Sequence, residues 1–262
     1  MSPLWRDELI VRLAPRELLF RRMRRGLRPT CIDESARTFE SSPLDWRSAL
    51  SVLSAYLGES QWSGTNVRVI VSNVWIRYAI VPWSESLTDD DERMSHARIC
   101  LVAAYGPKGA DWRVSLSEGA PGETRIACAL SESLLAGLRS TLDLHHAHLV
   151  SVQPALIAAY NTWRLRLPEG TGWFVSLEEN ALAAARFVAN GWDRVYSVRI
   201  GSDLVNEVRR LCLITRPATG NASDSRVYVD APMRLRSLLS DNEPNFEWLH
   251  DADVADATRL TT

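Results

Sequence analysis

Apolar and polar residues alternate at the start of the chain in the manner of a β-hairpin. Residues 7–13 and 17–22 form two short, mainly apolar runs, and Ala14-Pro15-Arg16 separates them as a turn. A third, weaker strand is expected between residues 28 and 39. The chain therefore opens with three strands in succession.

The next segment changes to helical spacing. Ser42 as cap and Pro43 in the first position predict the start of a helix, and Gly58 predicts its end. Apolar residues between them recur at three- and four-residue intervals, as expected for one buried helix face. A fourth strand is predicted at residues 67–72.

The later pattern continues this alternation and restarts after a linker at residues 167–172, which is rich in proline and glycine. Before the linker the sequence predicts strands at 75–82, 112–116, 124–130 and 149–152, and helices at 88–105, 131–143 and 154–164. After it the sequence predicts strands at 173–177, 181–189, 192–200, 226–229 and 246–249, and helices from about 204 to 212 and at 231–239. Asn190-Gly191 is a favoured hairpin turn between two of these strands.

The two halves share one order of elements: three strands, a helix, a strand, a helix and a strand. Such a β-β-β-α-β-α-β unit, present twice, is the plan of the bilobed actin-like, ribonuclease-H-type α/β fold. We therefore predict a first lobe at 1–167 with an inserted subdomain at about 73–130, and a second, shortened lobe at 168–262.

Composition narrows the class of partner. The formal net charge of −2 argues against a general preference for nucleic acid or anionic lipid, which needs a strong positive field. Basic residues nevertheless gather between residues 6 and 28, and they include Arg21, Arg22, Arg24 and Arg25. This group could contact phosphates or an acidic partner, or it could be the solvated face of the hairpin.

Cysteine usage and the start of the chain suggest a cytoplasmic protein. Cys31, Cys100, Cys128 and Cys212 lie far apart, without the short spacing of a zinc or iron–sulfur site, and we expect each to be a small buried apolar residue. The first residues lack the apolar segment of a signal peptide. We therefore expect the protein to reach a membrane only through a partner.

No convincing catalytic group emerges from the motifs. A metal role for the histidines at 145, 146 and 148 would need a further ligand, and a polar turn at a helix end is the simpler interpretation. The acidic run Asp89-Asp90-Asp91-Glu92 is typical of a first helical turn. We predict no catalytic residue, no metal and no cofactor. Among the ten tryptophans, Trp75 and Trp83 bracket a strand, and we select them as candidate interface residues.

Several passages of the chain resemble PilM-type pilus assembly proteins and the cytoplasmic domain of type II secretion L proteins. The matching residues are the hairpin at 173–188, the stretch Val198-Arg199-Ile200-Gly201-Ser202-Asp203-Leu204, which enters a helix, and Val150-Ser151-Val152-Gln153-Pro154-Ala155, which is similar to the turn that closes their first lobe. The resemblance implies a cytoplasmic platform at the bacterial inner membrane that binds the short cytoplasmic tail of a membrane partner. A homodimer is left open.

The chain departs from this family at the two places where phosphate would bind. A nucleotide site would need glycines and an acidic residue in each first hairpin, so that backbone amides and a magnesium ion can meet the phosphates. The first turn instead contains Pro15 and no glycine, and the second, Glu178-Glu179-Asn180, contains carboxylates and no glycine. We expect a non-catalytic scaffold of a type IV pilus or type II secretion-like machine. The alternative is a nucleotide-binding actin-like ATPase or regulator with an atypical phosphate site.

Overall fold

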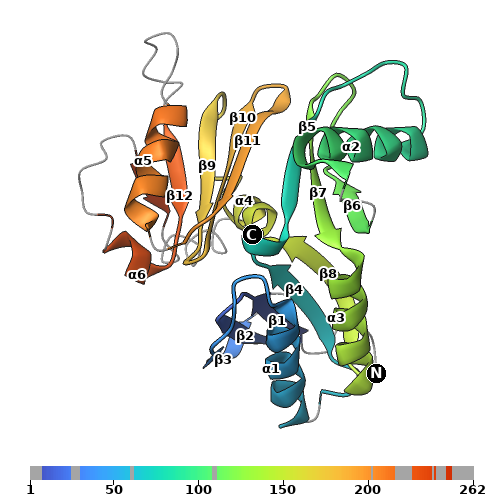
Figure 1. The fold of residues 1–262 in the computed structure, drawn as a ribbon, viewed down its shortest axis with the longest axis vertical. Helices are drawn as coiled ribbons and strands as arrows, with labels where there is room; N and C mark the ends of the chain where they lie inside the picture. The colour runs from blue at the N-terminus through green and yellow to red at the C-terminus, as the bar shows by residue number, and fades with distance from the viewer. Residues whose placement is uncertain are drawn as a thin grey trace. The chain divides into compact units, whose positions relative to one another are not determined.

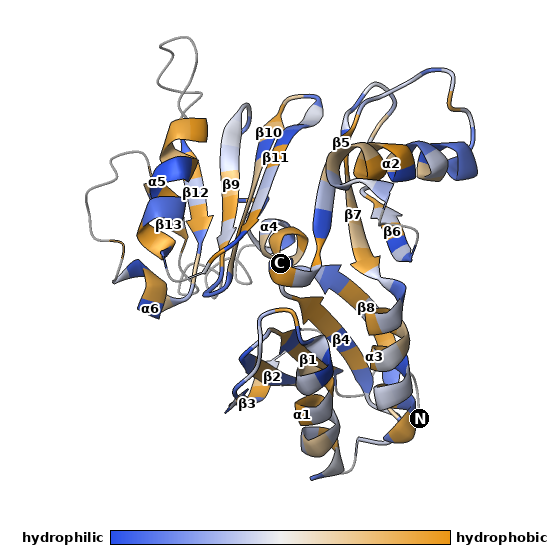
Figure 2. Cartoon of the chain, viewed as in Figure 1, coloured by the Kyte–Doolittle hydropathy of each residue, from blue (hydrophilic) through white to orange (hydrophobic). Residues whose placement is uncertain are grey.

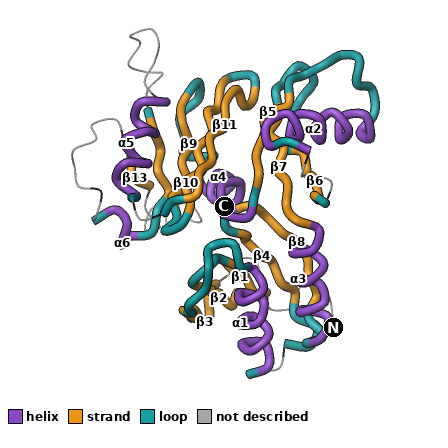
Figure 3. Tube along the Cα trace, viewed as in Figure 1, coloured by secondary structure: helices purple, strands orange, loops and turns teal. Residues whose placement is uncertain are grey.

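The computed structural model describes residues 8–24, 30–59, 62–107, 111–201, 203–215, 226–237, 239 and 246–249. The chain divides into two compact units, and each contains two separate segments. Unit 1 comprises Met1–Ile76 and Leu130–Ala155, and unit 2 comprises Arg77–Ala129 and Leu156–Thr262. Figure 1 labels the helices and strands, and Figure 3 shows strands and helices alternating within each unit.

Unit 1 is built on a five-stranded sheet with the order β3-β2-β1-β4-β8. Strands β1, β2 and β3 are antiparallel neighbours, whereas β4 and β8 run parallel to β1. The elements of this unit are β1 (Glu8–Leu13), β2 (Glu17–Arg24), β3 (Thr30–Thr38), α1 (Trp46–Gly58), β4 (Asn66–Val71), the 3-10 helix η2 (Asn73–Trp75), α3 (Glu132–Leu144) and β8 (His148–Pro154).

One face of this sheet forms the core of unit 1 because alternate residues of each strand point to the same side. Leu9, Val11 and Leu13 of β1 are fully buried, as are the matching residues of β4. The helices α1 and α3 contact each other, and Phe20 stacks on Tyr56 of α1 with ring centroids 3.6 Å apart. The hairpin and the helix that the sequence predicts therefore pack against each other in the core of unit 1.

Helix α1 begins three residues later than the sequence predicted. Its cap is Asp45, not Ser42, because the Asp45 carboxylate accepts hydrogen bonds from the backbone N–H groups of Arg47 at 3.1 Å and Ser48 at 3.3 Å. Residues from Ser42 to Asp45 form a turn instead, closed by the N–H of Asp45 and the carbonyl of Ser42. Both residue types are good caps, so the position of the turn decided between them.

The first segment of unit 2 is a small sheet with one covering helix. Its strands have the order β5-β7-β6 and comprise β5 (Arg77–Val81), β6 (Trp112–Leu116) and β7 (Arg125–Ser131). Helix α2 (Asp90–Tyr105) packs on this sheet through Ala97 and Leu101, which meet Ala79 and Val81 of β5. Figure 2 shows α2 changing from hydrophilic at its N-terminal end to hydrophobic at its C-terminal end.

The second segment of unit 2 repeats the strand plan of unit 1. Its sheet has the order β11-β10-β9-β12-β13, with three antiparallel strands followed by two parallel ones. Its elements are α4 (Ala155–Trp163), β9 (Gly172–Leu177), β10 (Ala181–Val188), β11 (Gly191–Arg199), α5 (Leu204–Thr215), β12 (Val227–Asp230), α6 (Met233–Arg236) and β13 (Phe246–Leu249).

Strand β9 is buried along its whole length because helices cover both faces of the sheet. Tyr160 of α4 meets Phe174 edge-on at 5.5 Å, while Trp173 and Val175 join the core cluster that contains Leu211 of α5. A central strand with two covered faces reads as continuously apolar. This explains the uninterrupted apolar run in the sequence at this position.

The same strand order occurs in two five-stranded sheets, and this confirms the predicted α/β class with a repeated strand plan. The lobe boundaries at 1–167 and 168–262 stay a prediction. Two local expectations were wrong. Helix α6 spans Met233–Arg236 and is shorter than the predicted 231–239, and Cys31 is exposed because it lies on the edge strand β3.

Candidate functional site

Two sheet edges lie next to each other in unit 2. Strand β5 is the outer strand of the small sheet, and β11 is the outer strand of the larger sheet. The two strands are in contact, yet no pairing joins them among the described residues. Each edge therefore offers backbone groups that its own sheet leaves unused.

The hydrogen-bond register identifies these outward groups on β11. The N–H of Ile200 donates to the carbonyl of Asn180 at 2.8 Å, which places Ile200 in a hydrogen-bonded pair on the β10 side. In an antiparallel pair, the backbone N–H and C=O groups of successive residues point alternately toward the partner strand and away from it. The backbone groups of Ser197 and Val195 therefore point away from β10, to the outer edge of the sheet.

The corresponding groups on β5 belong to Tyr78 and Ile80. Both backbone groups of Tyr78 meet the hydroxyl of Tyr105: the N–H donates to it at 3.3 Å, and the hydroxyl donates to the carbonyl at 3.1 Å. Tyr78 therefore faces away from β7, and Ile80, two residues further on, shares that direction.

An open groove of about 810 Å³ follows the line where β5 and β11 meet. Its apolar wall is the C-terminal half of α2, with Cys100, Ala103 and Ala104, and Ile214 of α5 contributes on the other side. Large aromatic side chains also line the groove, namely those of Tyr78, Tyr105, Trp173 and Tyr196. Burial raises the pKa of the Cys100 thiol, which is therefore predominantly neutral at pH 7.

One end of the groove is closed by a contact between the two sheets, which we call the clasp and define as Thr124 with residues 190–192. The N–H of Thr124 donates to the carbonyl of Asn190 at 3.0 Å, and the N–H of Trp192 donates to the carbonyl of Thr124 at 3.3 Å. The Thr124 hydroxyl also donates to the carbonyl of Trp192. Gly191 has a φ of 103°, and a Cβ there would lie 2.2 Å from the Thr124 carbonyl oxygen.

Charged residues of both signs lie on β5 and β11 beside the groove. Burial, and secondarily the nearby Arg199, lower the pKa of Arg77 at the end away from the clasp. At the clasp end Asp193 pairs with Arg186 at 2.6 Å, whereas Arg194 is exposed. The charged side chains that line the groove itself are Asp193 and Arg194, so the lining carries one charge of each sign.

The arginines selected from the sequence do not form one patch. Successive side chains of β2 point to opposite faces. Arg21 pairs with Glu34 of β3 at 2.9 Å, whereas the guanidinium of Arg22 lies 5.9 Å from the ring centroid of Trp62. Arg24 is exposed, and Arg25 lies outside the described residues. Their role in partner binding stays a prediction.

The two selected tryptophans occupy different environments. Trp75 lies in η2 in unit 1 and exposes only 9% of its surface. Trp83 is half-buried in unit 2, beside a notch of about 20 Å³ that Arg93 and Arg125 also line. That volume suits about one water molecule. Interface roles for both tryptophans stay predictions.

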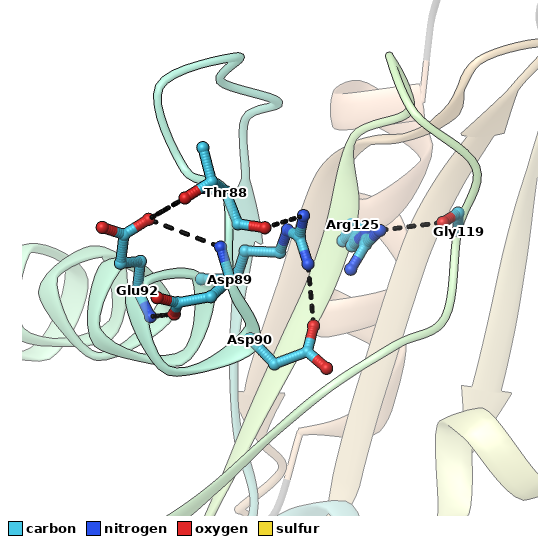
Figure 4. Close-up of polar contacts among 7 residues, drawn as sticks. Thr88, Asp89, Asp90, Glu92, Gly119 and Arg125 are labelled. Atoms are coloured by element: carbon cyan, nitrogen blue, oxygen red, sulfur yellow. Dashed lines mark hydrogen bonds and ion pairs between the residues drawn. The ribbon is translucent and has the colours of Figure 1, made fainter.

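The acidic run ahead of α2 has the structural role expected for a first helical turn. Asp89 and Glu92 form a reciprocal capping box, in which the Glu92 N–H donates to the Asp89 carboxylate at 2.7 Å. Arg93 donates to the Asp90 carboxylate at 2.8 Å, and Arg125 donates to the carbonyl of Gly119 at 2.8 Å (Figure 4). Asp89 and Glu92 thus serve the helix terminus.

The two hairpin turns in which the sequence analysis found no glycine are held by hydrogen bonds within the chain. In unit 1, Pro15 is buried and its carbonyl accepts a hydrogen bond from the Ser41 hydroxyl, while Phe39 donates to the carbonyl of Arg16 at 3.0 Å. In unit 2, Glu178 is only 5% exposed and its N–H donates to the carbonyl of Ala181 at 2.8 Å. Neither turn presents glycine amides.

The histidine turn shows local structural contacts. His145 lies 3.0 Å from the Ser54 hydroxyl through Nε2, and His146 adopts a φ of 54° in the tight turn before β8. Within the described part of the chain, no group of three or more His, Cys, Asp or Glu residues is placed to hold a metal ion. Helices in the same part of the chain are too short or too polar to span a membrane.

Tyr105 and the two strand edges were missed by reasoning from sequence. The pattern predicted a helix end at Tyr105, because Gly106 and Pro107 follow, but it gave no reason to connect Tyr105 with Tyr78. That contact depends on which strand lies at the edge of a sheet, and edge position leaves little trace in a single strand's pattern.

No protein-family model matches the sequence, and no curated protein matches it. Solved structures are similar to it. A PilM–PilN type IV pilus biogenesis complex aligns with a TM-score of 0.68 and 15% identity over 94% of this chain and 89% of that chain. A Bacteroides thetaiotaomicron protein with an actin-like ATPase fold and unknown function aligns with a TM-score of 0.64 and 12% identity over 100% and 99%.

The cytoplasmic domain of EpsL, an inner membrane component of the type II secretion system of Vibrio cholerae, is also similar. It aligns with a TM-score of 0.57 and 12% identity over 98% of this chain and 95% of that domain. The resemblance stated from the sequence is thus confirmed at the level of fold. The chain has the actin-like fold of a pilus component and a secretion component.

Proposed function

We propose that this chain is a non-catalytic cytoplasmic platform of a type IV pilus or type II secretion-like machine, and that it binds the cytoplasmic segment of an inner-membrane partner. The observation that carries this proposal is the groove where two sheet edges meet with outward backbone groups. An extended peptide can add to such an edge as a strand and use main-chain hydrogen bonds for affinity.

The structural neighbours support the general kind of role. One is a component of a complex between PilM and PilN, and another is the cytoplasmic domain of an inner membrane component. By analogy, this chain would lie at the cytoplasmic face of the inner membrane and reach the membrane through its partner. A scaffold also needs a stable fold more than a reactive site.

We infer that ATP hydrolysis is absent. The support comes from the two filled turns: the buried Pro15 in unit 1 supplies no N–H, and the buried Glu178 in unit 2 would repel a phosphate. Isothermal titration calorimetry with Mg²⁺ and ATP tests this inference. We expect no heat of binding, and micromolar affinity would favour the nucleotide-binding alternative.

The platform role is tested with synthetic peptides. These would cover the cytoplasmic segments of the membrane proteins encoded beside this chain, each with a scrambled control of the same composition. Fluorescence polarisation should show saturable binding of one segment and none of its scrambled form. Failure of every segment to bind would refute the platform role.

A further inference from the structure

Strand β3 turns one row of backbone groups outward at the edge of the unit 1 sheet. The N–H of Phe39, directly after the strand, donates to the carbonyl of Arg16 at 3.0 Å and so points toward β2. Because the direction alternates along an antiparallel pair, the backbone groups of Glu34, Ala36 and Thr38 point away from β2. These three residues are exposed, so a further strand can reach this edge.

The charged residues of β3 are placed symmetrically about Ser35. Asp33, Ser35 and Arg37 lie on the same face of the strand. In the part of the chain that the structure describes, the Asp33 carboxylate forms no ion pair. Arg37 donates through Nη2 to the Glu59 carboxylate at 2.9 Å and through Nη1 to the outward carbonyl of Ala36 at 3.3 Å. A neighbouring strand would satisfy that carbonyl and leave Nη1 available for an acid.

We propose that β3 pairs with β3 of a second copy of this chain, antiparallel and centred on Ser35, so that two unit 1 sheets join into one. In this register Asp33 of each copy lies opposite Arg37 of the other, and a two-fold axis relates the two contacts. Glu34 and Ala36 of opposite copies exchange N–H···O bonds, and both residues have the outward groups that such a pair requires.

The charges favour this register over its neighbours. Only a shift by two residues keeps outward groups opposite outward groups. Shifted one way, Glu34 lies opposite Glu34 of the other copy, and like charges in that position are destabilising. Shifted the other way, Arg37 lies opposite the neutral Ser35. Charges that discourage foreign strands therefore accept a second copy of β3.

Helix α1 leaves room for the second copy. It packs on β2. In the joined sheet, the two β2 strands are separated by three strand spacings, which amount to about 14 Å. Packed helices need only about 8 to 10 Å between their axes, so the two α1 helices fit on one face. A register shift ahead of Asp33 limits the paired part to residues 33–37, and so small an interface predicts a weak dimer.

Complementary charge reversals test this pairing. Asp33→Arg places an arginine opposite Arg37 of the other copy, and Arg37→Asp places an aspartate opposite Asp33. Sedimentation velocity at up to about 1 mM protein measures self-association, and a fluorescent label on one variant detects mixed dimers. Glu85→Arg, which makes the same change of charge at an exposed residue of unit 2, is the control. Circular dichroism melts verify that each variant is folded.

We expect the wild type and Glu85→Arg to dimerise equally well. Each β3 variant should dimerise at least about tenfold more weakly, because two attractive pairs become two repulsive ones. An equal mixture of Asp33→Arg and Arg37→Asp should form heterodimers about as tightly as the wild type dimerises, because both contacts again join opposite charges. Amide exchange at Glu34 and Ala36 should slow as the wild-type concentration rises.

The pairing is refuted if the wild type stays monomeric at about 1 mM, if either β3 variant dimerises as well as the wild type, or if the folded variants form no heterodimer. Concentration-dependent protection confined to other strands would also refute it. The exchange measurement uses the wild type, so it decides the question even where a variant is unstable. The dimer does not depend on the proposed function, and the peptide tests of that function are decided separately.

Discussion

The clasp makes a specific prediction for the stability of unit 2. In Gly191→Ala the new Cβ would lie 2.2 Å from the carbonyl oxygen of Thr124, closer than any van der Waals contact allows. The clash is with backbone, so no side-chain rotation can relieve it. Either the turn at Asn190-Gly191 or the start of β7 must move, and the hydrogen bonds of the clasp are lost with that movement.

The expected cost has two parts. A side chain at a φ of 103° is strained by roughly 1 to 3 kcal/mol. The N–H groups of Thr124 and Trp192 lose partners at 3.0 and 3.3 Å, and a hydrogen bond contributes about 1 kcal/mol net. Gly191→Ala should therefore lower the free energy of unfolding by about 3 to 5 kcal/mol.

Urea denaturation followed by tryptophan fluorescence and circular dichroism measures this loss. Gly201→Ala is the matched control, because Gly201 has no atom within 4 Å of its Cβ position and no positive φ. The control should change stability by less than about 0.5 kcal/mol. Equal stability of the two variants would show that the clasp does not constrain unit 2. Faster amide exchange at Trp192 in Gly191→Ala would locate the effect.

Three further predictions concern the rest of the chain. Hydrogen bonding from Ser48 lowers the pKa of Asp45 below its ordinary value of 3.8. The charged Asp45 cap therefore stabilises α1 fully above pH 3.8, and this stabilisation is lost as the pH falls through the lowered pKa. Thermal melts should show a smaller dependence on acid pH in Ser48→Ala than in the wild type. Cys31 is exposed, whereas burial raises the pKa of Cys128 to about 11. A thiol reagent at about pH 8 should therefore label Cys31 first and Cys128 only after unfolding. Early labelling of Cys128 would contradict its burial. Leu53 is fully buried, so Leu53→Ala should lower the free energy of unfolding in urea by about 2 to 5 kcal/mol. Ile99 is exposed, so Ile99→Ala should change that free energy little. Similar losses in the two variants would refute the assigned core.

The order of elements could be read from the sequence because each strand and helix has its own period. The apolar runs at 8–13 and 172–177 became the first strands of two sheets. The predicted hairpin also formed, but its turn residues are Ala189 and Asn190, and Gly191 is the first residue of β11. Local signals decided these positions. The start of α1 was missed, because Ser42 and Asp45 are both competent caps and only the turn between them selects one.

The candidate groove could not be predicted in the same way. It requires that β5 and β11 are both outer strands and that the insertion returns to the larger sheet at Thr124, and these are long-range facts. The two phosphate turns were different, since the absence of glycine at Pro15 and Glu178 is visible in the sequence. The composition of a turn can thus be read directly from the sequence, whereas the position of a strand at a sheet edge cannot.

Edge strands need protection, and the chain protects two of them differently. Strand β3 is exposed along most of its length and carries Asp33, Glu34 and Arg37, and charged side chains discourage pairing with other chains. Strand β5 carries no charged residue other than Arg77, and near its start both backbone groups of Tyr78 are hydrogen-bonded to the hydroxyl of Tyr105. The edge of β5 is therefore satisfied at Tyr78 by a side chain, whereas the edge of β3 is shielded by charge.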